Sequence, residues 1–332
     1  MLSQTRADDV ATALWLALRH LAGSGYRFIT PTPQTHQRIL AHRGVQMAAT
    51  LRDVFGLNMP FKIATCAGMT RELIAAMRGA GVLQTRGDML QSRVRVSSLD
   101  DDLFVHSAYP APQDDAVFFG PDTYRFARFI QQGVATFQST GTGSLRLLDV
   151  GCGSGAGGIV AARALAKLGP LEVCMNDINP LALQYAAVNA SFAGVAVKPA
   201  LGNALRAVTG DFDLIISNVP YLDEVAKRTD GNRGSGVGHA LSVQIGQEAL
   251  ARLAPGGRLL LYTGVAIVDC VDAFLADMLP LLTGGQPGAQ FEWSYSEIDP
   301  DVFGEELQQP VHAHIDRIAA VGLTVTRKTG TQ

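Results

Sequence analysis

The stretch from Leu145 to Ile159, which reads LRLLDVGCGSGAGGI, constrains the fold of this chain more than any other. Apolar residues run into Asp149 and Val150, five glycines follow between positions 151 and 158, and an alanine-rich run continues to Leu168. This order predicts a buried parallel strand, a tight turn and the start of a helix. Glycine permits a positive φ and leaves no Cβ between the backbone and a bound group. The stretch fits a nucleotide-binding turn, and taken alone it fits a plain tight turn equally well.

From Leu145 onward, apolar strands and helices alternate to the end of the chain. We place strands at 145–150, 171–176, 195–200, 212–217, 257–263, 289–296 and 322–328. The helices are placed at 157–168, 180–193, 242–253, 266–279 and 311–320. Such a βα repeat, ending in an antiparallel pair, predicts an α/β fold with a doubly wound sheet, which binds its ligands at the carboxyl ends of the strands.

The first 110 residues follow a different pattern. We expect helices over 8–22 and 70–79, the second capped by Thr70, and one or two further helices over 37–49 and 47–55. Alternating strands follow at 82–84, 92–98 and 103–107. The pattern predicts an N-terminal α+β, winged-helix-like domain over residues 1–110 and a second domain over 111–332. A proline-rich linker is expected at 108–120 and a helix at 121–132. The first domain would recognise a substrate, bind nucleic acid, or act as a lid or dimerisation element.

Composition and charge limit the partners. A chain of 332 residues, 47% of them hydrophobic and 17% charged, can bury a large core and favours two domains. The net charge of −3 argues against a protein that binds polyanions over its whole surface. Residues 1–110 carry 12 Lys and Arg against 8 Asp and Glu, and the rest carry 15 against 22. The basic excess at the front fits an acidic partner or an ordinary solvated surface.

The cysteines and the N-terminus bear on the compartment. Cys66, Cys152, Cys174 and Cys270 lie far apart without a C-x-x-C pair, so we expect neither a disulfide framework nor a metal site. The N-terminus lacks an apolar signal core, and no run of about 18 apolar residues occurs. We expect a cytoplasmic protein without a membrane partner.

An acidic residue follows the second strand. Asp177 comes 22 residues after Gly155, where a carboxylate can accept hydrogen bonds from both ribose hydroxyls of a nucleoside lying across the glycine turn. Capping the next helix is its alternative role, but Asn179, directly before Pro180, is the better cap. We therefore predict that Asp177 binds a ribose.

The segment Asp213–Tyr221, DLIISNVPY, predicts a buried strand that stops at Asn218. The Asn218 side-chain oxygen and the Val219 carbonyl can both accept hydrogen bonds from a planar –NH₂ group, on which the Tyr221 ring can stack. Two acceptors in the plane of that group would turn the nitrogen lone pair towards an electrophilic carbon, which is catalysis by positioning. The alternative is an ordinary turn, since Asn218 and Pro220 are common turn residues.

The stretches LLDVGCGSG, NDINP and SNVPY together resemble the successive motifs of class I S-adenosylmethionine-dependent methyltransferases. The last motif is similar to that of members that methylate sp² nitrogens, such as release-factor glutamine N5-methyltransferases and N6-adenine or N2-guanine nucleic-acid methyltransferases. Segment 117–130 is similar to one that lies over the methionine end of the cofactor in those enzymes, and 250–264 is similar to their segment before the fifth strand. The resemblance covers about residues 115–265 and implies a seven-stranded Rossmann-like sheet.

The resemblance also implies S-adenosylmethionine as cofactor and gives roles to the matching residues. The implied cofactor-binding residues are Asp149, Gly151, Gly153 and Gly155 at the methionine portion, Asp177 at the ribose, Ile178 and Asn203 at the adenine, and Asn218. The implied catalytic residues are Asn218, Pro220 and Tyr221, and the implied substrate-binding residues are Thr123, Val219 and Tyr221. Two positions depart from the family pattern: Asn203 replaces an acidic residue and Val219 replaces a proline. The Asn203 oxygen and the Val219 carbonyl still supply acceptors, so the second change alters mainly the shape of the substrate pocket.

Other interpretations stay open. Gly151, Gly153 and Ala156 loosely match a dinucleotide fingerprint, which suits an NAD-dependent oxidoreductase, although the NVPY turn has no task in hydride transfer. A winged-helix regulator that senses a ligand is the non-enzymatic alternative. For a methyltransferase, the substrate is a protein glutamine, an RNA or DNA base, or a small molecule.

The polar, glycine-rich segment between Tyr221 and Ser242 is predicted to be a substrate lid. Its cations Lys227, Arg228 and Arg233 would meet an anionic or polar substrate, or only aid solubility. His239 is expected to be structural, and His312 and His314, on different faces of the predicted helix, are not expected to bind a metal.

Overall fold

The computed structural model of the chain describes residues 2–43, 47–108, 115–138, 143–219, 239–284 and 290–329, which form two compact units. Unit 1 comprises Met1–Tyr124, Gly153–Ile159 and Asn179–Val197. Unit 2 comprises Arg125–Cys152, Val160–Ile178 and Lys198–Gln332. The boundary near residue 110 stays a prediction, and residues 109–114 of the expected linker lie outside the described residues.

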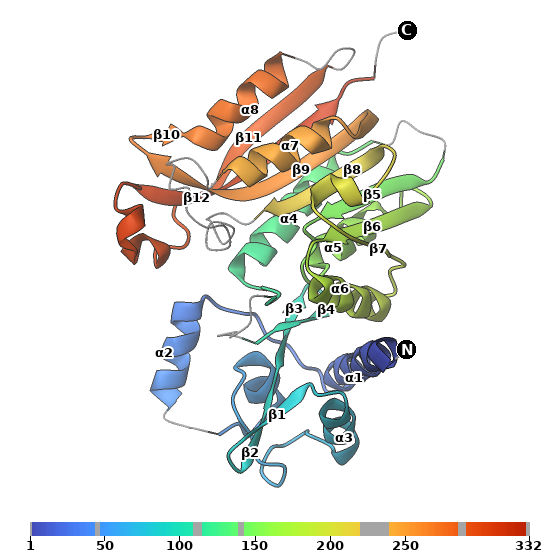
Figure 1. Ribbon diagram of the computed structural model, residues 1–332, viewed down its shortest axis with the longest axis vertical. Helices are drawn as coiled ribbons and strands as arrows, with labels where there is room; N and C mark the ends of the chain where they lie inside the picture. The colour runs from blue at the N-terminus through green and yellow to red at the C-terminus, as the bar shows by residue number, and fades with distance from the viewer. Residues whose placement is uncertain are drawn as a thin grey trace. The chain divides into compact units, whose positions relative to one another are not determined.

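Unit 2 is built on a sheet with the strand order β11-β12-β9-β8-β5-β6-β7 (Figure 1). The strands are β5 (Leu145–Val150), β6 (Leu171–Asp177), β7 (Lys198–Leu201), β8 (Phe212–Val219), β9 (Leu253–Val268), β11 (Phe291–Asp299) and β12 (Arg317–Arg327), and the short β10 (Val271–Asp272) pairs with β9. Strands β5 to β9 all run parallel to one another, whereas β12 is antiparallel to β9 and to β11. The seven predicted strands are confirmed. The strand order reverses between β5 and β8, and ligands of open α/β sheets bind at such a switch point.

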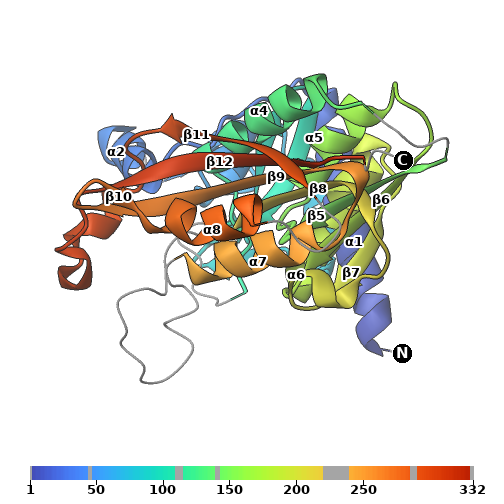
Figure 2. The ribbon, with the colours of Figure 1, turned by 90° about the horizontal axis from the view of Figure 1, so that it is seen from above.

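Helices cover both faces of this sheet (Figure 2). The helices between and beside its strands are α4 (Pro121–Ala135), α5 (Ala156–Leu165), α7 (Ala240–Leu250) and α8 (Ala273–Thr283). On β9, the side chains of Leu259 and Leu261 belong to the core shared with α7 and α8. Tyr262, the next residue on the strand, faces Phe126 of α4 at 5.8 Å between ring centroids. This alternation is what a strand buried on both faces requires.

The helix predicted over 266–279 is wrong in its first part. β9 continues to Val268 because it stays paired with β12, with Ile267 opposite Arg317. Asp269 and Cys270 then take positive φ values of 50° and 63°, which turn the chain. Helix α8 begins only after Asp272, whose carboxylate accepts a hydrogen bond from the backbone N–H of Leu275 at 3.0 Å.

The helix predicted over 311–320 is also wrong. Residues Pro310–His312 form a single 3₁₀ turn, and β12 begins at Arg317. The apolar run from Ile318 lies between β9 and β11, so it is buried as a central strand. A short apolar run fits a buried helix or a buried strand equally well, which is why its periodicity misled the prediction.

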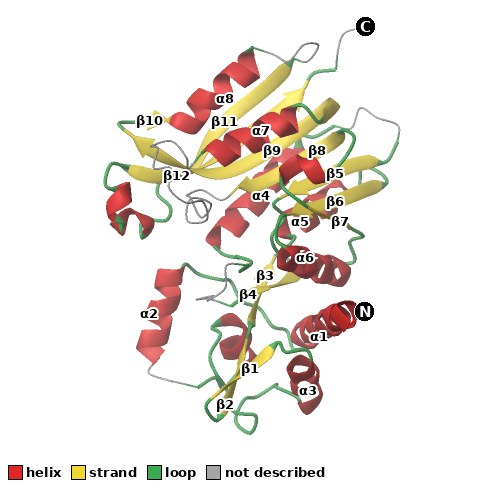
Figure 3. Cartoon of the chain, in the orientation of Figure 1, coloured by secondary structure: helices red, strands yellow, loops and turns green. Residues whose placement is uncertain are grey.

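Unit 1 combines three N-terminal helices, two hairpins and one later helix (Figure 3). Its elements are α1 (Leu2–Gly23), α2 (Pro33–Arg43), α3 (Arg71–Gly79), β1 (Leu83–Arg86), β2 (Met89–Ser92), β3 (Val94–Leu99), β4 (Asp102–Ser107) and α6 (Pro180–Ala193). The hairpins β1–β2 and β3–β4 are antiparallel and form two separate sheets, so the single strand predicted over 92–98 is wrong: β2 ends at Ser92 and β3 begins at Val94. Thr70 caps α3 by accepting a hydrogen bond from the backbone N–H of Leu73, and Asn179 caps α6 through the N–H of Leu181. Both predicted caps are confirmed.

Helix α6 belongs to unit 1, although it follows β6 in the sequence. Its side chains Ala182, Tyr185 and Val188 are part of one apolar core with α1, α3 and the hairpins. Phe192 meets the ring of Trp15 edge-on at 6.3 Å between centroids. The later helix therefore buries its apolar face against the first hundred residues.

The helices predicted over 37–49 and 47–55 need correction. Helix α2 ends at Arg43, and a single wide π-helical turn covers Arg52–Gly56. Before that turn, the Thr50 hydroxyl accepts from the backbone N–H of Asp53 at 3.3 Å, and the Asp53 carboxylate accepts from the N–H of Thr50 at 3.0 Å. This reciprocal pair is a capping box, which starts a helical turn at Thr50 and so ends any helix that precedes it.

No helix in the described part of the chain is both long and apolar enough to cross a membrane.

Candidate active site

Two polar side chains mark the carboxyl ends of the strands that flank β5. Val150, the last residue of β5, lies opposite Asn176 of β6 and Ser217 of β8. Asp177 and Asn218 are the next residues on those two strands, so they stand level with each other on either side of the chain leaving β5. Since neighbouring strands are spaced by about 4.8 Å, the two backbones are roughly 10 Å apart. The register thus brings two of the predicted site residues to one edge of the sheet.

The glycine turn that follows β5 has the predicted backbone geometry. Gly151, Gly153 and Gly155 take positive φ values of 67°, 54° and 79°. A Cβ added at Gly151 or Gly153 would meet no atom within 4 Å. Backbone conformation, rather than crowding by protein atoms, therefore requires glycine there, and the space beside these two residues is open. Asp149, which lies two residues before the turn, is buried in β5.

The turn also contains a cysteine that the sequence analysis gave no role. The backbone N–H of Cys152 donates to the carbonyl of Asn176 at 2.9 Å, which ties the turn to the end of β6. Burial, with the charges of Asp149 and Asp177, holds the pKa of the Cys152 thiol well above its usual range. A thiol in that state is not a nucleophile.

The next part of the sheet edge carries the residues predicted to contact adenine. Ile178 exposes 67% of its surface directly after β6, and Asn203 is exposed after β7. The Asn176 amide donates to the carbonyl of Gly202 at 3.0 Å, and the N–H of Gly202 donates to the carbonyl of Asp177 at 3.0 Å. Sequence reasoning missed Asn176, although an amide next to the predicted ribose ligand was a signal for it.

Asn218 and Val219 end β8 beside a pair of buried hydroxyls. Asn218 is half-buried and Val219 is buried. The Thr263 hydroxyl of β9 lies 2.9 Å from that of Ser242 on α7 and donates a long hydrogen bond of 3.5 Å to the Val219 carbonyl. Neither hydroxyl was predicted, because nothing in the sequence shows that α7 and β9 meet at this carbonyl.

Several predicted residues lie outside the described part of the chain. They are Pro220, Tyr221 and the expected lid with Lys227, Arg228 and Arg233. His239 and His312 make local contacts. The Nε2 atom of His239 lies 2.8 Å from a carboxylate oxygen of Asp277, and the Nδ1 atom of His312 lies 2.8 Å from the carbonyl of Glu306.

Thr123, predicted to contact substrate, lies in unit 1 at the start of α4. Its hydroxyl accepts from the backbone N–H of Gly120 at 3.3 Å. The neighbouring Tyr124 hydroxyl accepts from the N–H of Thr30 at 3.1 Å, and Phe119 stacks on His106 at 5.1 Å. These contacts fix the segment before α4 within unit 1.

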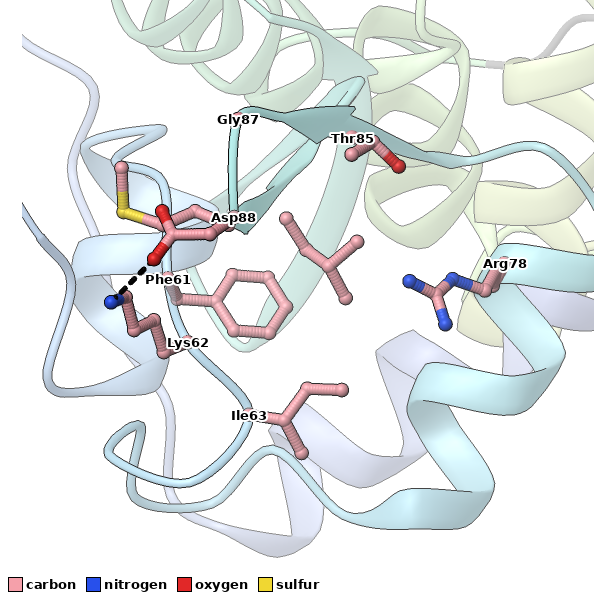
Figure 4. A pocket seen from close by; sticks show the side chains of 9 residues that line it. Phe61, Lys62, Ile63, Arg78, Thr85, Gly87 and Asp88 are labelled. Atoms are coloured by element: carbon pink, nitrogen blue, oxygen red, sulfur yellow. Dashed lines mark ion pairs between the residues drawn. The ribbon is translucent and has the colours of Figure 1, made fainter.

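Unit 1 has a hollow of about 250 Å³ between α3, the β1–β2 hairpin and the segment around Lys62 (Figure 4). Lys62 and Asp88 form an ion pair at 2.6 Å on one side, and Arg78 of α3 lies on the other. The exposed Ile63 adds an apolar wall. Arg78 is one of two cations of the predicted helix 70–79, and a cluster of basic side chains that would indicate a nucleic-acid-binding face does not surround this hollow within the described residues.

Comparison with known proteins identifies the central part of the chain. Residues 134–265 match the family model "Methyltransferase small domain". This part of the chain is therefore similar to a methyltransferase domain. The match begins in α4 and ends in β9, so it contains every sheet-edge residue described above. The comparisons give no support to hydride transfer or to ligand sensing without catalysis.

Curated relatives match the methyltransferase domain and part of its surroundings. A release factor glutamine methyltransferase of Deinococcus radiodurans is 37% identical over 130 residues, which cover 35% of this chain and 44% of the relative. A ribosomal protein L11 methyltransferase of Syntrophotalea carbinolica is 32% identical over 195 residues, or 56% of this chain and 55% of the relative. A ribosomal RNA small subunit methyltransferase C of Serratia proteamaculans is 37% identical over 79 residues, or 24% of this chain and 22% of the relative. The chain spans about half the length, or less, of these relatives.

Among solved structures, the crystal structure of wild-type Trm5b from Pyrococcus abyssi has 17% sequence identity and a TM-score of 0.48, and the match covers 74% of this chain and 62% of that one. A ribosomal protein L11 methylase from Lactobacillus delbrueckii has 18% identity and a TM-score of 0.39, with 67% and 91% covered.

Proposed function

We propose that this protein is an S-adenosylmethionine-dependent N-methyltransferase that acts on a planar amide or amino nitrogen. The observation that carries the proposal is the sheet register, which sets Asp177 and Asn218 level on either side of the strand that leads into the glycine turn. A ribose ligand and a nitrogen-binding amide at one edge are what transfer from a nucleoside donor requires. The methyltransferase match over residues 134–265 supports the same activity.

The residues at this edge fit the cofactor. The space beside Gly151 and Gly153 is open, the Asp177 carboxylate can accept from hydroxyl groups, and the exposed Ile178 offers an apolar surface to a purine ring. S-adenosylmethionine supplies an electrophilic methyl group on a positively charged sulfur. In the proposal, Asp177 binds its ribose and Asn203 its adenine amino group.

The chain's own part in the reaction is to orient the substrate nitrogen. The Asn218 oxygen and the Val219 carbonyl each accept one N–H of the substrate, so the nitrogen lone pair stands out of the amide plane towards the methyl group. The Thr263 hydroxyl, 3.5 Å from the Val219 carbonyl, helps to hold that acceptor in place. The resemblance of the sequence motif, and no described contact, gives Tyr221 the role of stacking on the substrate plane and Pro220 that of stiffening the turn.

The names of the relatives bear on the substrate. They include proteins named for release factor glutamine, for ribosomal protein L11 and for ribosomal RNA. Two of these three names specify a protein substrate, and the mild charge of this chain lacks the strong basic excess expected of an RNA modifier. We therefore propose a protein side-chain nitrogen as the first substrate to test, before a nucleobase or a small molecule.

The test combines binding and transfer. S-adenosylmethionine should raise the melting temperature of the purified protein, whereas NAD should not. With methyl-labelled cofactor and separate protein, RNA and small-molecule fractions, the label should enter the protein fraction. Asn218→Ala should lower transfer by roughly 10²- to 10³-fold, as the loss of one positioning group does elsewhere, while cofactor affinity stays within about threefold. Transfer at the wild-type rate by Asn218→Ala would contradict the proposed mechanism.

A further inference from the structure

Asn189 of α6 is a fully buried amide whose bonds reach two distant segments of unit 1. Its side-chain oxygen accepts from the backbone N–H of Val105 at 2.8 Å. Its nitrogen donates to the carbonyl of Val105 at 3.0 Å and to the carbonyl of Ser154 at 2.9 Å. Both amide hydrogens and the oxygen are therefore used, and the side chain has one orientation that satisfies all three bonds.

The two segments joined by Asn189 differ in stiffness. Val105 lies inside β4, where the hairpin with β3 and the surrounding core hold the backbone. Ser154 lies in the glycine turn, between Gly153 and Gly155, both at positive φ. Glycine has the largest conformational freedom of any residue, so a turn with glycine on both sides of one residue needs an outside contact to select a single form. Asn189 supplies that contact from a rigid strand.

The bond to Ser154 also sets the direction of the next peptide N–H. In a trans peptide the carbonyl of Ser154 and the N–H of Gly155 point in opposite directions. Because the Ser154 carbonyl points to Asn189, the Gly155 N–H points to the opposite side of the peptide, away from Asn189. Helix α5 begins directly after this residue, at Ala156, and N–H groups at a helix start favour a negatively charged partner.

We infer that Asn189 is a positioning residue for the cofactor: by holding the Ser154 carbonyl, it presents the Gly155 N–H to the carboxylate of the methionine portion of S-adenosylmethionine. The inference rests on the proposed function. Strand β4 of the amino-terminal region then holds the glycine turn in place through the hydrogen bonds of Asn189. The amino-terminal part of the chain then serves cofactor binding as well as any substrate recognition.

The experiment measures S-adenosylmethionine binding by isothermal titration calorimetry for the wild-type chain and three variants. Asn189→Ala removes all three bonds, and Asn189→Asp keeps the size and the acceptor while removing the amide donors. Ser98→Ala is the matched control, because the buried Ser98 hydroxyl clamps both the N–H and the carbonyl of Phe28 in unit 1, at 2.7 Å and 3.2 Å, without touching the glycine turn. Circular dichroism establishes which variants are folded.

We expect Asn189→Ala to weaken S-adenosylmethionine binding about tenfold, or about 1.4 kcal/mol, and Ser98→Ala to lower the melting temperature without changing affinity. Methyl transfer at saturating cofactor should fall by less than about threefold in Asn189→Ala, which separates a KM effect from a kcat effect. In Asn189→Asp, affinity should recover as the pH falls from 8 to 6, since a buried carboxyl becomes protonated and can donate again. If Asn189→Ala does not fold, the pH profile of Asn189→Asp still tests the inference.

Four outcomes overturn the inference. If the wild-type chain binds S-adenosylmethionine and folded Asn189→Ala binds it equally well, the inference is wrong while the proposed function stands. If Ser98→Ala loses as much affinity as Asn189→Ala, or if Asn189→Asp shows no recovery at low pH, Asn189 is a stabilising residue only. If the wild-type chain does not bind S-adenosylmethionine at all, the proposed function fails and the inference fails with it.

Discussion

At the scale of single residues, we predict that the charge of Asp177 contributes to the affinity for S-adenosylmethionine. A carboxylate that accepts from two hydroxyls forms charge-assisted bonds, which are stronger than neutral ones. Asp177→Ala should therefore weaken S-adenosylmethionine binding by roughly ten- to a hundredfold, and Asp177→Asn, which keeps one acceptor oxygen, should fall between it and the wild type. Calorimetry would measure the dissociation constants.

The control for this prediction lies on the same strand. Glu172 stands near the start of β6, at the opposite end from Asp177, where it pairs with Lys198 at 3.1 Å. Glu172→Ala should leave the dissociation constant unchanged. If Asp177→Ala and the wild type bind S-adenosylmethionine equally well, Asp177 does not bind the ribose.

The candidate site residues that sequence reasoning proposed and those that it overlooked differ in where their partners lie. Asp177, Asn218 and the glycines follow predicted strands directly, so their place at the sheet edge follows from the strand order alone. Asn189 and Thr263 make contacts with segments at least 35 residues away in the sequence. Such contacts depend on the packing of elements, which periodicity does not show.

At the scale of elements, the capping box formed by Thr50 and Asp53 predicts a pH-dependent stability. The buried Asp53 carboxylate accepts from the Thr50 hydroxyl at 2.8 Å, from the N–H of Ala49 at 3.2 Å and from the Arg43 guanidinium at 2.5 Å. Burial alone would raise the pKa of Asp53, but the hydrogen bonds from Thr50, Ala49 and Arg43 outweigh it and hold the pKa below its usual 3.8. Because the pKa is lower in the folded state, the carboxylate stabilises the fold above about pH 4, and this contribution is lost as the pH falls through the folded-state pKa.

Asp53→Asn should accordingly lower the free energy of unfolding by about 1–3 kcal/mol at pH 7, and the difference from the wild type should shrink below about pH 4. Urea titrations at pH 7 and pH 3 measure both values. Asp101→Asn is the control, since Asp101 is almost fully exposed in its ion pair with Arg27, and it should change little at either pH. A difference between Asp53→Asn and wild type that stays constant with pH would show that the carboxylate charge does not stabilise this turn.

Two of the elements that were predicted wrongly share one physical cause. The runs at 266–272 and 313–320 are apolar or mixed segments whose state is decided by pairing between β9 and β12, more than 45 residues apart in the sequence. Thr50 and Asp53 are the opposite case, because the spacing T-x-x-D was visible as a capping box and marks where a new helical turn starts. Local signals predicted the caps at Thr70 and Asn179 correctly for the same reason.

At the scale of the whole molecule, α6 shows that the sequence alone does not tell which helix belongs to which unit. The helix was predicted with its correct bounds, but its sequence PLALQYAAVNASFA is apolar nearly all round, so periodicity could not show which face meets which partner. The structure places that helix in unit 1, with Ala182, Tyr185 and Val188 in the core formed by α1, α3 and the hairpins. A methyltransferase domain cut out at residue 110 would leave these side chains without that core.

The last prediction follows from this division. A fragment of residues 115–332 contains the whole match to the methyltransferase family, yet it should not fold cooperatively. Exposing three buried side chains of α6 costs about 5 kcal/mol or more, and the Asn189 amide would lose its bonds to Val105, while a whole domain is stable by only about 5–15 kcal/mol. Thermal unfolding followed by circular dichroism should show a broad or absent transition for the fragment and a cooperative one for the full chain, with binding of a hydrophobic dye to the fragment alone. The opposite result is a fragment that melts cooperatively and binds S-adenosylmethionine with the affinity of the full chain. That result would show that α6 folds without the first hundred residues and that the glycine turn keeps its conformation without β4.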